Sequence, residues 1–323
     1  MRTRRLILLL LLAASLSPAC RPRTPRSPAE QRGVRAFPFP EIPALYAGPA
    51  ERQEYLTDHF WDAFLAGDGP CDSSAVLGVP RAEVEQQMSN YISLLEQIPL
   101  AQAQQKMRAF FRQVEERQVA DTGSRVFLLM EEIVGHYLYD PNSPMRSEDL
   151  YLPYVEGLAS SPCTREAARP GYAYQRAMCA LAQTGSVAPD FRLTDLAGRT
   201  RRLHGIRAER VLLFFSNPGC HACGEIVRIL QDIPGLDAMI AAGELAVVSV
   251  YIDEDIDKWR AYARDCPAGW ICAYDPDALV RSDRIYNIRA IPSLYLLDRD
   301  KRILLKDAPA ERVAAFLQNQ QNR

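Results

Sequence analysis

The sequence has little excess of either charge, few cysteines and almost no lysine. Its 323 residues include 38 Lys+Arg and 40 Asp+Glu, a formal net charge of −2, which gives no global basis for nucleic-acid binding. Only four of the basic residues are lysine, a bias to which we attach no functional weight. The eight cysteines are far below the roughly 8–10% of a small disulfide scaffold. A hydrophobic content of 48% excludes a mainly disordered chain, and the length suits about two domains.

The first 20 residues have the pattern of an export signal. Three arginines precede an apolar run of 11 residues from Leu6 to Leu16, and small residues follow. A transmembrane helix needs about 20 apolar residues. The pattern therefore predicts a signal peptide over residues 1–19, with Cys20 as the first residue of the mature chain.

The end of this segment resembles the lipobox of bacterial lipoproteins, in which a small residue precedes an acylated cysteine. Ala19 precedes Cys20, while Ser17 stands where Leu is usual, so ordinary signal cleavage is the alternative. The resemblance implies lipidation of Cys20 and a protein anchored to a membrane of the bacterial cell envelope, with its domains in the periplasm or at the cell surface. Residues 20–36, rich in Pro and Arg, are expected to form a flexible tether.

Between residues 37 and 182 the apolar spacing is helical. Three stretches place apolar residues on one helix face, namely 84–98, 107–114 and 126–137. The prolines of the turn cluster Asp140–Pro144 predict the end of the third helix. No strand pattern interrupts this half, so we expect an all-α domain. Aromatic residues beside His59 indicate core packing more than a ligand groove.

From residue 185 to residue 323 the pattern alternates between strands and helices. Strands are predicted at 191–193, 200–203, 211–215, 245–252, 294–297 and 303–305, and amphipathic helices at 220–232, 256–264 and 310–319. This alternation predicts an α/β layer fold whose strands are buried on both faces.

A candidate redox site follows the apolar strand 211–215. The strand leads through a turn to Cys220-His221-Ala222-Cys223 and a helix starting near Glu225. A helix N-terminus stabilises a thiolate, so we expect a pKa for Cys220 below the free value of about 8.5. Cys223 lies about one turn further on and can attack a mixed disulfide formed on Cys220. A protonated His221 would favour the thiolate further; the other interpretation is an exposed residue at the helix start.

Residues 185–323 resemble the thioredoxin-like thiol–disulfide oxidoreductases, particularly the membrane-tethered TlpA/ResA type. The resemblance rests on the entry segment Val187–Phe191, the motif Cys220–Cys223 and the loop Ile291–Ser293, which recur in this order. The N-terminal half resembles a helical module of unknown function found ahead of thioredoxin-like domains in bacterial lipoproteins, through the stretch Tyr137–Arg146.

The resemblance implies a central mixed sheet flanked by helices, with Cys220 and Cys223 as catalytic residues and no cofactor or metal besides this dithiol. It implies a cis peptide bond before Pro292 and places Pro292, Ile291 and His221 at the substrate. The expected partners are protein thiols and disulfides and an unidentified electron donor, and reduction is the favoured direction.

Three features depart from the family. Gly219 precedes the first cysteine, where many members have Trp, and the dipeptide between the cysteines is His221-Ala222, where thioredoxin has Gly-Pro. Phe214 stands where thioredoxin buries a carboxylate used in proton transfer. The redox potential and the proton-transfer group are therefore open, and Glu225 is a candidate for the latter by proximity.

Three other functions compete for the same residues. A peroxiredoxin-like thiol peroxidase needs Thr or Ser three residues before its nucleophile, where this chain has Asn217. Zinc binding by Cys220, Cys223, Cys266 and Cys272 is disfavoured in an exported protein. The third alternative is a non-catalytic binding or assembly module that uses the fold as a scaffold.

Five cysteines remain after Cys20 and the motif pair. Cys266 and Cys272 could form a disulfide, as could Cys163 and Cys179, which would leave Cys71 over. The spacing alone decides neither pairing.

Overall fold

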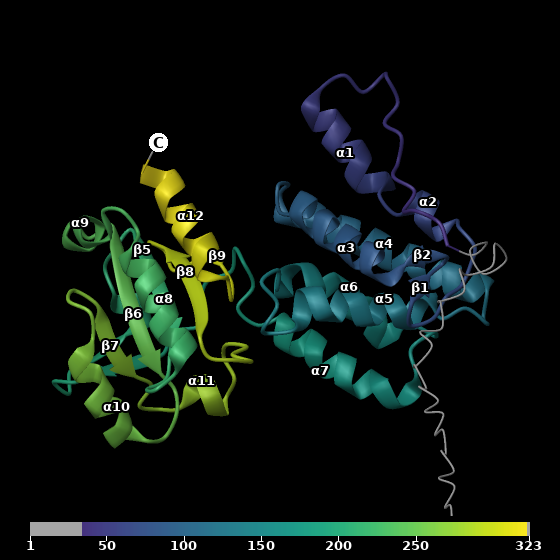
Figure 1. Cartoon of the computed structure of the whole chain (residues 1–323). Helices are drawn as coiled ribbons and strands as arrows, with labels where there is room; N and C mark the ends of the chain where they lie inside the picture. Colours follow the sequence, from purple (N-terminus) through teal and green to yellow (C-terminus); the bar gives the residue numbers. More distant parts are fainter. Residues whose placement is uncertain (1–33, 322–323) are drawn as a thin grey trace, which may run out of the picture. The chain divides into compact units, whose positions relative to one another are not determined.

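The computed structural model describes residues 34–321, which belong to one compact unit (Figure 1). The predicted signal peptide, Cys20 and most of the predicted tether lie outside the described residues. No helix within residues 34–321 is long and apolar enough to cross a membrane. Because helical and α/β regions share this unit, their division into two separate domains stays a prediction.

The N-terminal region is helical, as the sequence predicts. The predicted helices are α3 (Arg81–Leu95), α4 (Leu100–Ala120) and α5 (Val126–Val134), and α5 continues as a π-helical turn, Gly135–Tyr139, that ends at the predicted turn cluster. The other helices are α1 (Pro49–His59), α2 (Asp62–Leu65), α6 (Glu148–Ser160), the short 3-10 helix Glu166–Ala168 and α7 (Arg169–Cys179).

Aromatic residues fill the core of this region. Phe60 and Trp61 are each 2% exposed and Phe64 is fully buried, which confirms core packing. His59 instead lies on the surface, where its Nδ1 is 2.7 Å from Asp62 Oδ2.

The expectation that no strand interrupts the helical half is wrong. Strands β1 (Ala75–Val76) and β2 (Val79–Pro80) form a hairpin. Leu77 and Gly78 at its turn both have positive φ, 48° and 78°, as the tight turns of two-residue hairpins require. Two-residue strands are too short to leave a periodic pattern. Arg35, from the predicted tether, donates its backbone N–H to the Gly78 carbonyl at 2.8 Å, so the chain is already fixed at that residue.

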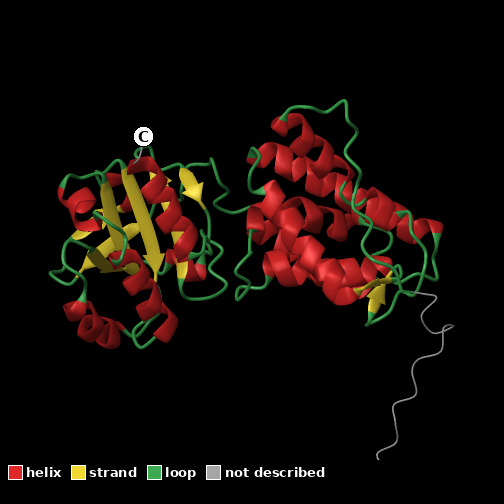
Figure 2. Ribbon diagram, turned by 45° about the horizontal axis from the view of Figure 1, so that its top comes forward, coloured by secondary structure: helices red, strands yellow, loops and turns green. Residues whose placement is uncertain are grey.

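The C-terminal region contains a mixed seven-stranded sheet with helices on its faces, which confirms the predicted fold class (Figure 2). The order is β4-β3-β7-β6-β5-β8-β9. The strands are β3 (Arg192–Asp195), β4 (Thr200–Arg202), β5 (Arg210–Phe215), β6 (Leu245–Tyr251), β7 (Ile271–Tyr274), β8 (Ser293–Asp298) and β9 (Ile303–Leu305). At the centre, β5 pairs in parallel with β6 and antiparallel with β8.

Strand β5 contributes to apolar clusters on both faces of the sheet. Leu212 and Phe214 belong to one cluster, and Leu213 and Phe215 belong to the other, because successive side chains of a strand point to opposite faces. The helices of this region are α8 (His221–Gln231), α9 (Leu236–Ala241), α10 (Ile256–Tyr262), α11 (Leu279–Ser282) and α12 (Ala310–Gln321). The short elements β7, α9 and α11 were not predicted.

Asp190 fastens the entry segment to the turn after β4. Its Oδ2 lies 2.6 Å from Arg202 Nε and its Oδ1 accepts the His204 backbone N–H at 3.0 Å. Burial alone would raise the pKa of Asp190, but these hydrogen bonds outweigh it and hold the pKa below its ordinary value.

We therefore predict that Asp190→Asn lowers the free energy of unfolding by about 0.5–1 kcal/mol at pH 7. A lowered folded-state pKa contributes stability that is complete above the unfolded-state pKa and is lost as pH falls through the folded-state pKa. The difference between wild type and variant in urea unfolding should consequently stay constant down to about pH 5 and shrink as the pH falls further, through the ordinary Asp pKa of 3.8 and below it. A difference independent of pH would contradict this assignment.

Candidate redox site

The motif cysteines lie where the central strand passes into α8. Beyond β5, the hydroxyl of buried Ser216 is hydrogen-bonded to that of Ser249 at 2.8 Å. Gly219 then has φ +76°, a left-handed conformation that favours glycine. No atom within 4 Å would meet a Cβ there. Backbone conformation, and not lack of space, therefore favours glycine at this position.

Helix α8 (His221–Gln231) begins one residue after the start of the predicted amphipathic stretch 220–232, and four residues before Glu225. Cys220 is its N-cap, and its Sγ accepts the backbone N–H of Cys223 at 3.1 Å. The sulfur thus satisfies one of the free N–H groups of the first turn. This contact and the helix dipole both favour a thiolate on Cys220.

Cys220 and Cys223 form a disulfide, with Cα atoms 5.2 Å apart. Their exposures differ. Cys220 is half-buried, while Cys223 is 1% exposed and belongs to the apolar cluster under α8. A second thiol or disulfide can therefore approach Cys220 from solvent, but not Cys223.

His221 and Glu225 both lie on the outer side of α8. The His221 side chain is 86% exposed and its Nε2 is 3.3 Å from Glu225 Oε1, with Glu225 53% exposed. Phe214 is fully buried and meets Trp270 edge to face. The position of the buried carboxylate in thioredoxin is thus apolar here, and Glu225 lies in solvent.

The register of the sheet brings the Pro292 loop to the cysteines. Phe215 at the end of β5 pairs with Ser293 at the start of β8, so the loop before Ser293 and the turn after Phe215 leave the same edge. The Ile291–Pro292 peptide bond is cis, as the resemblance implies. Ile291 packs against the apolar cluster that contains Cys223.

A groove that the sequence does not reveal runs along this loop. Its volume is about 430 Å³, and its lining includes Ile252, Asp253 and Ile291 from the α/β region and Tyr139 and Tyr174 from the helical region. The pattern contains no signal for it, because its walls are far apart in the sequence.

Asp253 links the groove to the motif turn. Its Oδ2 accepts a hydrogen bond from Asn217 Nδ2 at 2.6 Å, and its Oδ1 lies 3.6 Å from Arg281 Nη1. Asn217 is the residue that stands in place of the peroxidase Thr or Ser. Its amide nitrogen is therefore engaged with Asp253.

Of the two further disulfides that the sequence allows, the structure contains one. Cys266 and Cys272 form a disulfide, with Cα atoms 6.3 Å apart, whereas Cys71, Cys163 and Cys179 are free thiols. The pairing of Cys163 with Cys179 is thus wrong: Cys179 is a free thiol buried in the helical core, and Cys163 is a free thiol half-buried at its edge. The four sulfurs considered for zinc are all held in disulfides.

Burial raises the pKa of the Cys179 thiol to about 12, and the side chain is fully buried. Because the thiolate is the reactive species, we predict that iodoacetamide at pH 8 leaves Cys179 unmodified in the native protein and modifies it after denaturation. Cys71 and Cys163, both half-buried, serve as internal controls in the same mass spectra. Labelling of Cys179 at the rate of Cys163 would contradict the prediction.

The fold and the CXXC motif beside a proline loop define a thioredoxin-like protein. A family model described as "Domain of unknown function (DUF5106)" matches residues 16–180. The crystal structure of a thioredoxin-like protein from Bacteroides caccae is 33% identical, covers 88% of this chain and 99% of its own, and has a TM-score of 0.76. The chain therefore belongs to the thioredoxin-like proteins whose N-terminal part contains DUF5106.

Two shorter structures match the C-terminal region. The C-terminal domain of an uncharacterized protein from Bacteroides fragilis is 39% identical over 42% of this chain and 98% of its own, with a TM-score of 0.41. The thioredoxin domain of a thiol-disulfide oxidoreductase from Bacteroides vulgatus is 22% identical over 43% of this chain and 97% of its own, with a TM-score of 0.38. Comparison with curated proteins gave no match.

Proposed function

We propose that the protein is a thiol–disulfide oxidoreductase that exchanges disulfides with protein substrates through Cys220 and Cys223. The observation that carries the proposal is the unequal exposure of one bonded pair at a helix start. Cys220 is accessible at the N-cap, and Cys223 is buried one turn further on. This is the arrangement that an attacking and a resolving cysteine require.

In the proposed reaction, the Cys220 thiolate attacks one sulfur of a substrate disulfide. The substrate S–S bond breaks, a mixed disulfide forms on Cys220, and the leaving sulfur takes up a proton. The Cys223 thiolate then attacks Cys220, which releases the second substrate thiol and closes the Cys220–Cys223 bond. Two electrons have passed to the substrate, so a separate dithiol donor must reduce the pair again.

The surrounding groups assist specific steps. The N–H of Cys223 and the positive end of α8 stabilise the Cys220 thiolate before it attacks the substrate disulfide. Ile291, which packs against the apolar cluster containing Cys223, and the adjacent Pro292 would contact the substrate backbone. His221 would contact the substrate from the exposed side of α8. We propose reduction as the physiological direction, on the resemblance to the TlpA/ResA type.

The Cys223→Ser variant should stop the reaction at the mixed disulfide. We predict that this variant traps substrate proteins on Cys220, and that traps disappear on adding a reductant or on the further change Cys220→Ser. Cys163→Ser, which removes a half-buried free thiol, is the matched control and should trap nothing.

The measurement is non-reducing electrophoresis followed by mass spectrometry, alongside a redox titration of the unmutated pair. Absence of traps together with slow alkylation of Cys220 would favour the binding scaffold. A rapid second-order reaction of Cys220 with hydrogen peroxide would favour the peroxidase.

The proposed location is the bacterial cell envelope, with Cys20 as a lipid anchor and the described residues in the periplasm or at the cell surface. We predict that the wild-type protein partitions with membranes and that Cys20→Ala shifts it to the soluble fraction. Cys71→Ala is the matched control and should partition like the wild type. Equal partitioning of Cys20→Ala and wild type would contradict the anchor.

A further inference from the structure

A buried lysine joins the helical region to the strand end beyond β9. Lys306 is 0% exposed and its Nζ lies 3.0 Å from Oε2 of Glu148, which is 1% exposed. The same Nζ donates to the backbone carbonyls of Cys179 at 2.7 Å and Leu181 at 2.6 Å. A buried ammonium is tolerated only when paired and hydrogen-bonded, and Lys306 has the ion pair with Glu148 and the two hydrogen bonds to carbonyls.

The other carboxylate oxygen of Glu148 binds the loop that leads to Pro292. Glu148 Oε1 accepts Arg289 Nε at 2.9 Å and also accepts Asn287 Nδ2. Arg289 donates in addition to the Tyr139 carbonyl, and its guanidinium carbon lies 4.1 Å from the centre of the Tyr139 ring, a cation–π contact. Two loop residues are thus bound to the helical region.

The loop is also held on the far side of Pro292. The Ser293 hydroxyl donates to Asp307 Oδ1 at 2.7 Å, and Asp307 Oδ2 lies 3.3 Å from Nε of Arg146 in the helical region. Arg289 Nη2 approaches the same oxygen at 3.8 Å. Side chains on both sides of Pro292 therefore end in one cluster of buried charges.

Glu148 is placed for this task by α6. It is the first residue of that helix, after the N-cap Ser147, whose hydroxyl accepts the Leu150 N–H. The positive helix end favours a carboxylate there. Burial raises the pKa of Glu148, and its cationic partners Lys306 and Arg289 offset part of that effect. Without the carboxylate, the charges of Lys306 and Arg289 would be left facing each other inside the protein.

We propose that the helical region positions the substrate-binding loop of the redox site: Glu148, acting through Asn287 and Arg289, fixes the loop that ends at Pro292. This inference rests on the proposed function and assigns a role to the DUF5106 part of the chain. Glu148 acts through the loop, so it is a positioning residue and takes no part in electron transfer.

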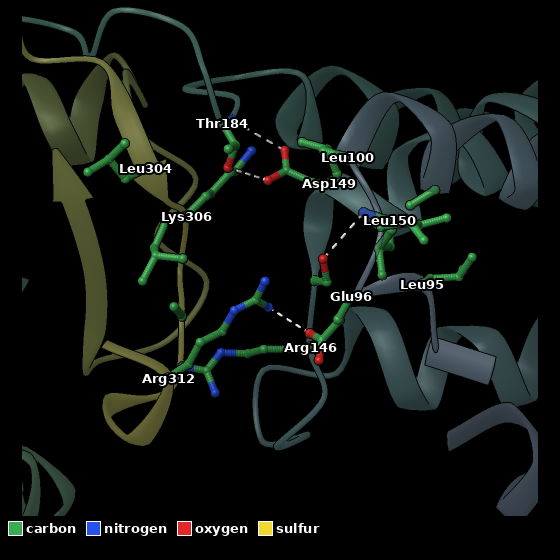
Figure 3. A pocket seen from close by; sticks show the side chains of 15 residues that line it. Leu95, Glu96, Leu100, Arg146, Asp149, Leu150, Thr184, Leu304, Lys306 and Arg312 are labelled. Atoms are coloured by element: carbon green, nitrogen blue, oxygen red, sulfur yellow. Dashed lines mark hydrogen bonds and ion pairs between the residues drawn. The ribbon is translucent and has the colours of Figure 1, made fainter. Parts of the chain in front are cut away.

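A second contact between the two regions supplies a matched control. Figure 3 shows Glu96 of the helical region paired with Arg312 of α12, at 2.6 Å, and Asp149 accepting from the Thr184 hydroxyl, at 2.6 Å. These pairs border a cavity of about 220 Å³ that Lys306 also lines. Glu96 has no bond to the Pro292 loop among its described interactions, so Glu96→Gln removes a carboxylate between the regions and spares the loop.

The experiment compares Glu148→Gln, Asn287→Ala and Glu96→Gln in the full chain, purified in detergent, with insulin as the disulfide substrate and dithiothreitol as the electron donor. We expect Glu148→Gln and Asn287→Ala to lower kcat/KM about 10- to 100-fold, carried by KM, because the loosened loop binds the substrate less well. Alkylation of Cys220 by iodoacetamide, which needs no loop, should stay within about 2-fold of wild type. Glu96→Gln should match wild type in every measurement.

Asn287→Ala leaves every buried charge in place. If Glu148→Gln fails to fold, Asn287→Ala therefore still tests the inference. Wild-type KM and kcat in Asn287→Ala would overturn the inference, as would an equal KM increase in Glu96→Gln. Inactivity of the wild type towards insulin would instead contradict the proposed function. The inference would then be decided by amide hydrogen exchange, which should be faster over residues 287–293 in Glu148→Gln than in Glu96→Gln and is contradicted by equal rates.

Discussion

The pairing of β5 with β8 is the constraint on which the candidate site depends. Because Phe215 is opposite Ser293, the turn that leads to Cys220 and the loop that ends at Pro292 leave the sheet at one edge. Both strands are apolar and buried on both faces, and a shift of one residue would turn every side chain to the wrong face. Hydrophobic burial thus fixes the position of a polar reaction.

The hydrogen bonds between β5 and β8 fix the backbone only where the two strands are paired, and this pairing ends at Ser293. Residues 287–292 belong to no strand, so their backbone lacks the cross-strand bonds that hold β8. Side-chain bonds from Asn287, Arg289 and Ser293 to buried carboxylates take over this function. One of those carboxylates, Glu148, comes from the helical region, which makes that region part of the site in physical terms.

The strand–turn–helix unit around Cys220 could be predicted from the sequence because its signals are local. A continuous apolar strand, a glycine turn and an amphipathic helix follow each other between Arg210 and Gln231, and the predicted stretch 220–232 agrees with the helix His221–Gln231. A cysteine side chain capping its own helix at Cys220 is outside the usual capping residues. The hairpin β1–β2 and strand β7 were too short to produce a period.

Long-range contacts could not be predicted in this way. Glu148 and Lys306 are far apart in the sequence, and a charged residue at a helix start is ordinarily a solvated one. Asn217 and Asp253 are likewise far apart in the sequence. Charged residues directly after the buried strand β9, as in Leu305-Lys306-Asp307, indicate that a buried ion pair is possible there. The sequence does not indicate that Glu148 is the partner of Lys306, because only the tertiary structure brings the two together.

The geometry of the side chain explains why position 306 is one of the few lysines. In a chain whose basic residues are almost all arginine, the lysine at position 306 meets three acceptors around one nitrogen, from Glu148, Cys179 and Leu181. An ammonium is compact and has three donors, whereas a guanidinium is planar with five and would leave some unsatisfied in the same space. Arg289 shows the converse, since its planar group both lies over Tyr139 and reaches Glu148. The two cations are therefore not interchangeable, and their geometry decides which one the chain uses on each side of the same carboxylate.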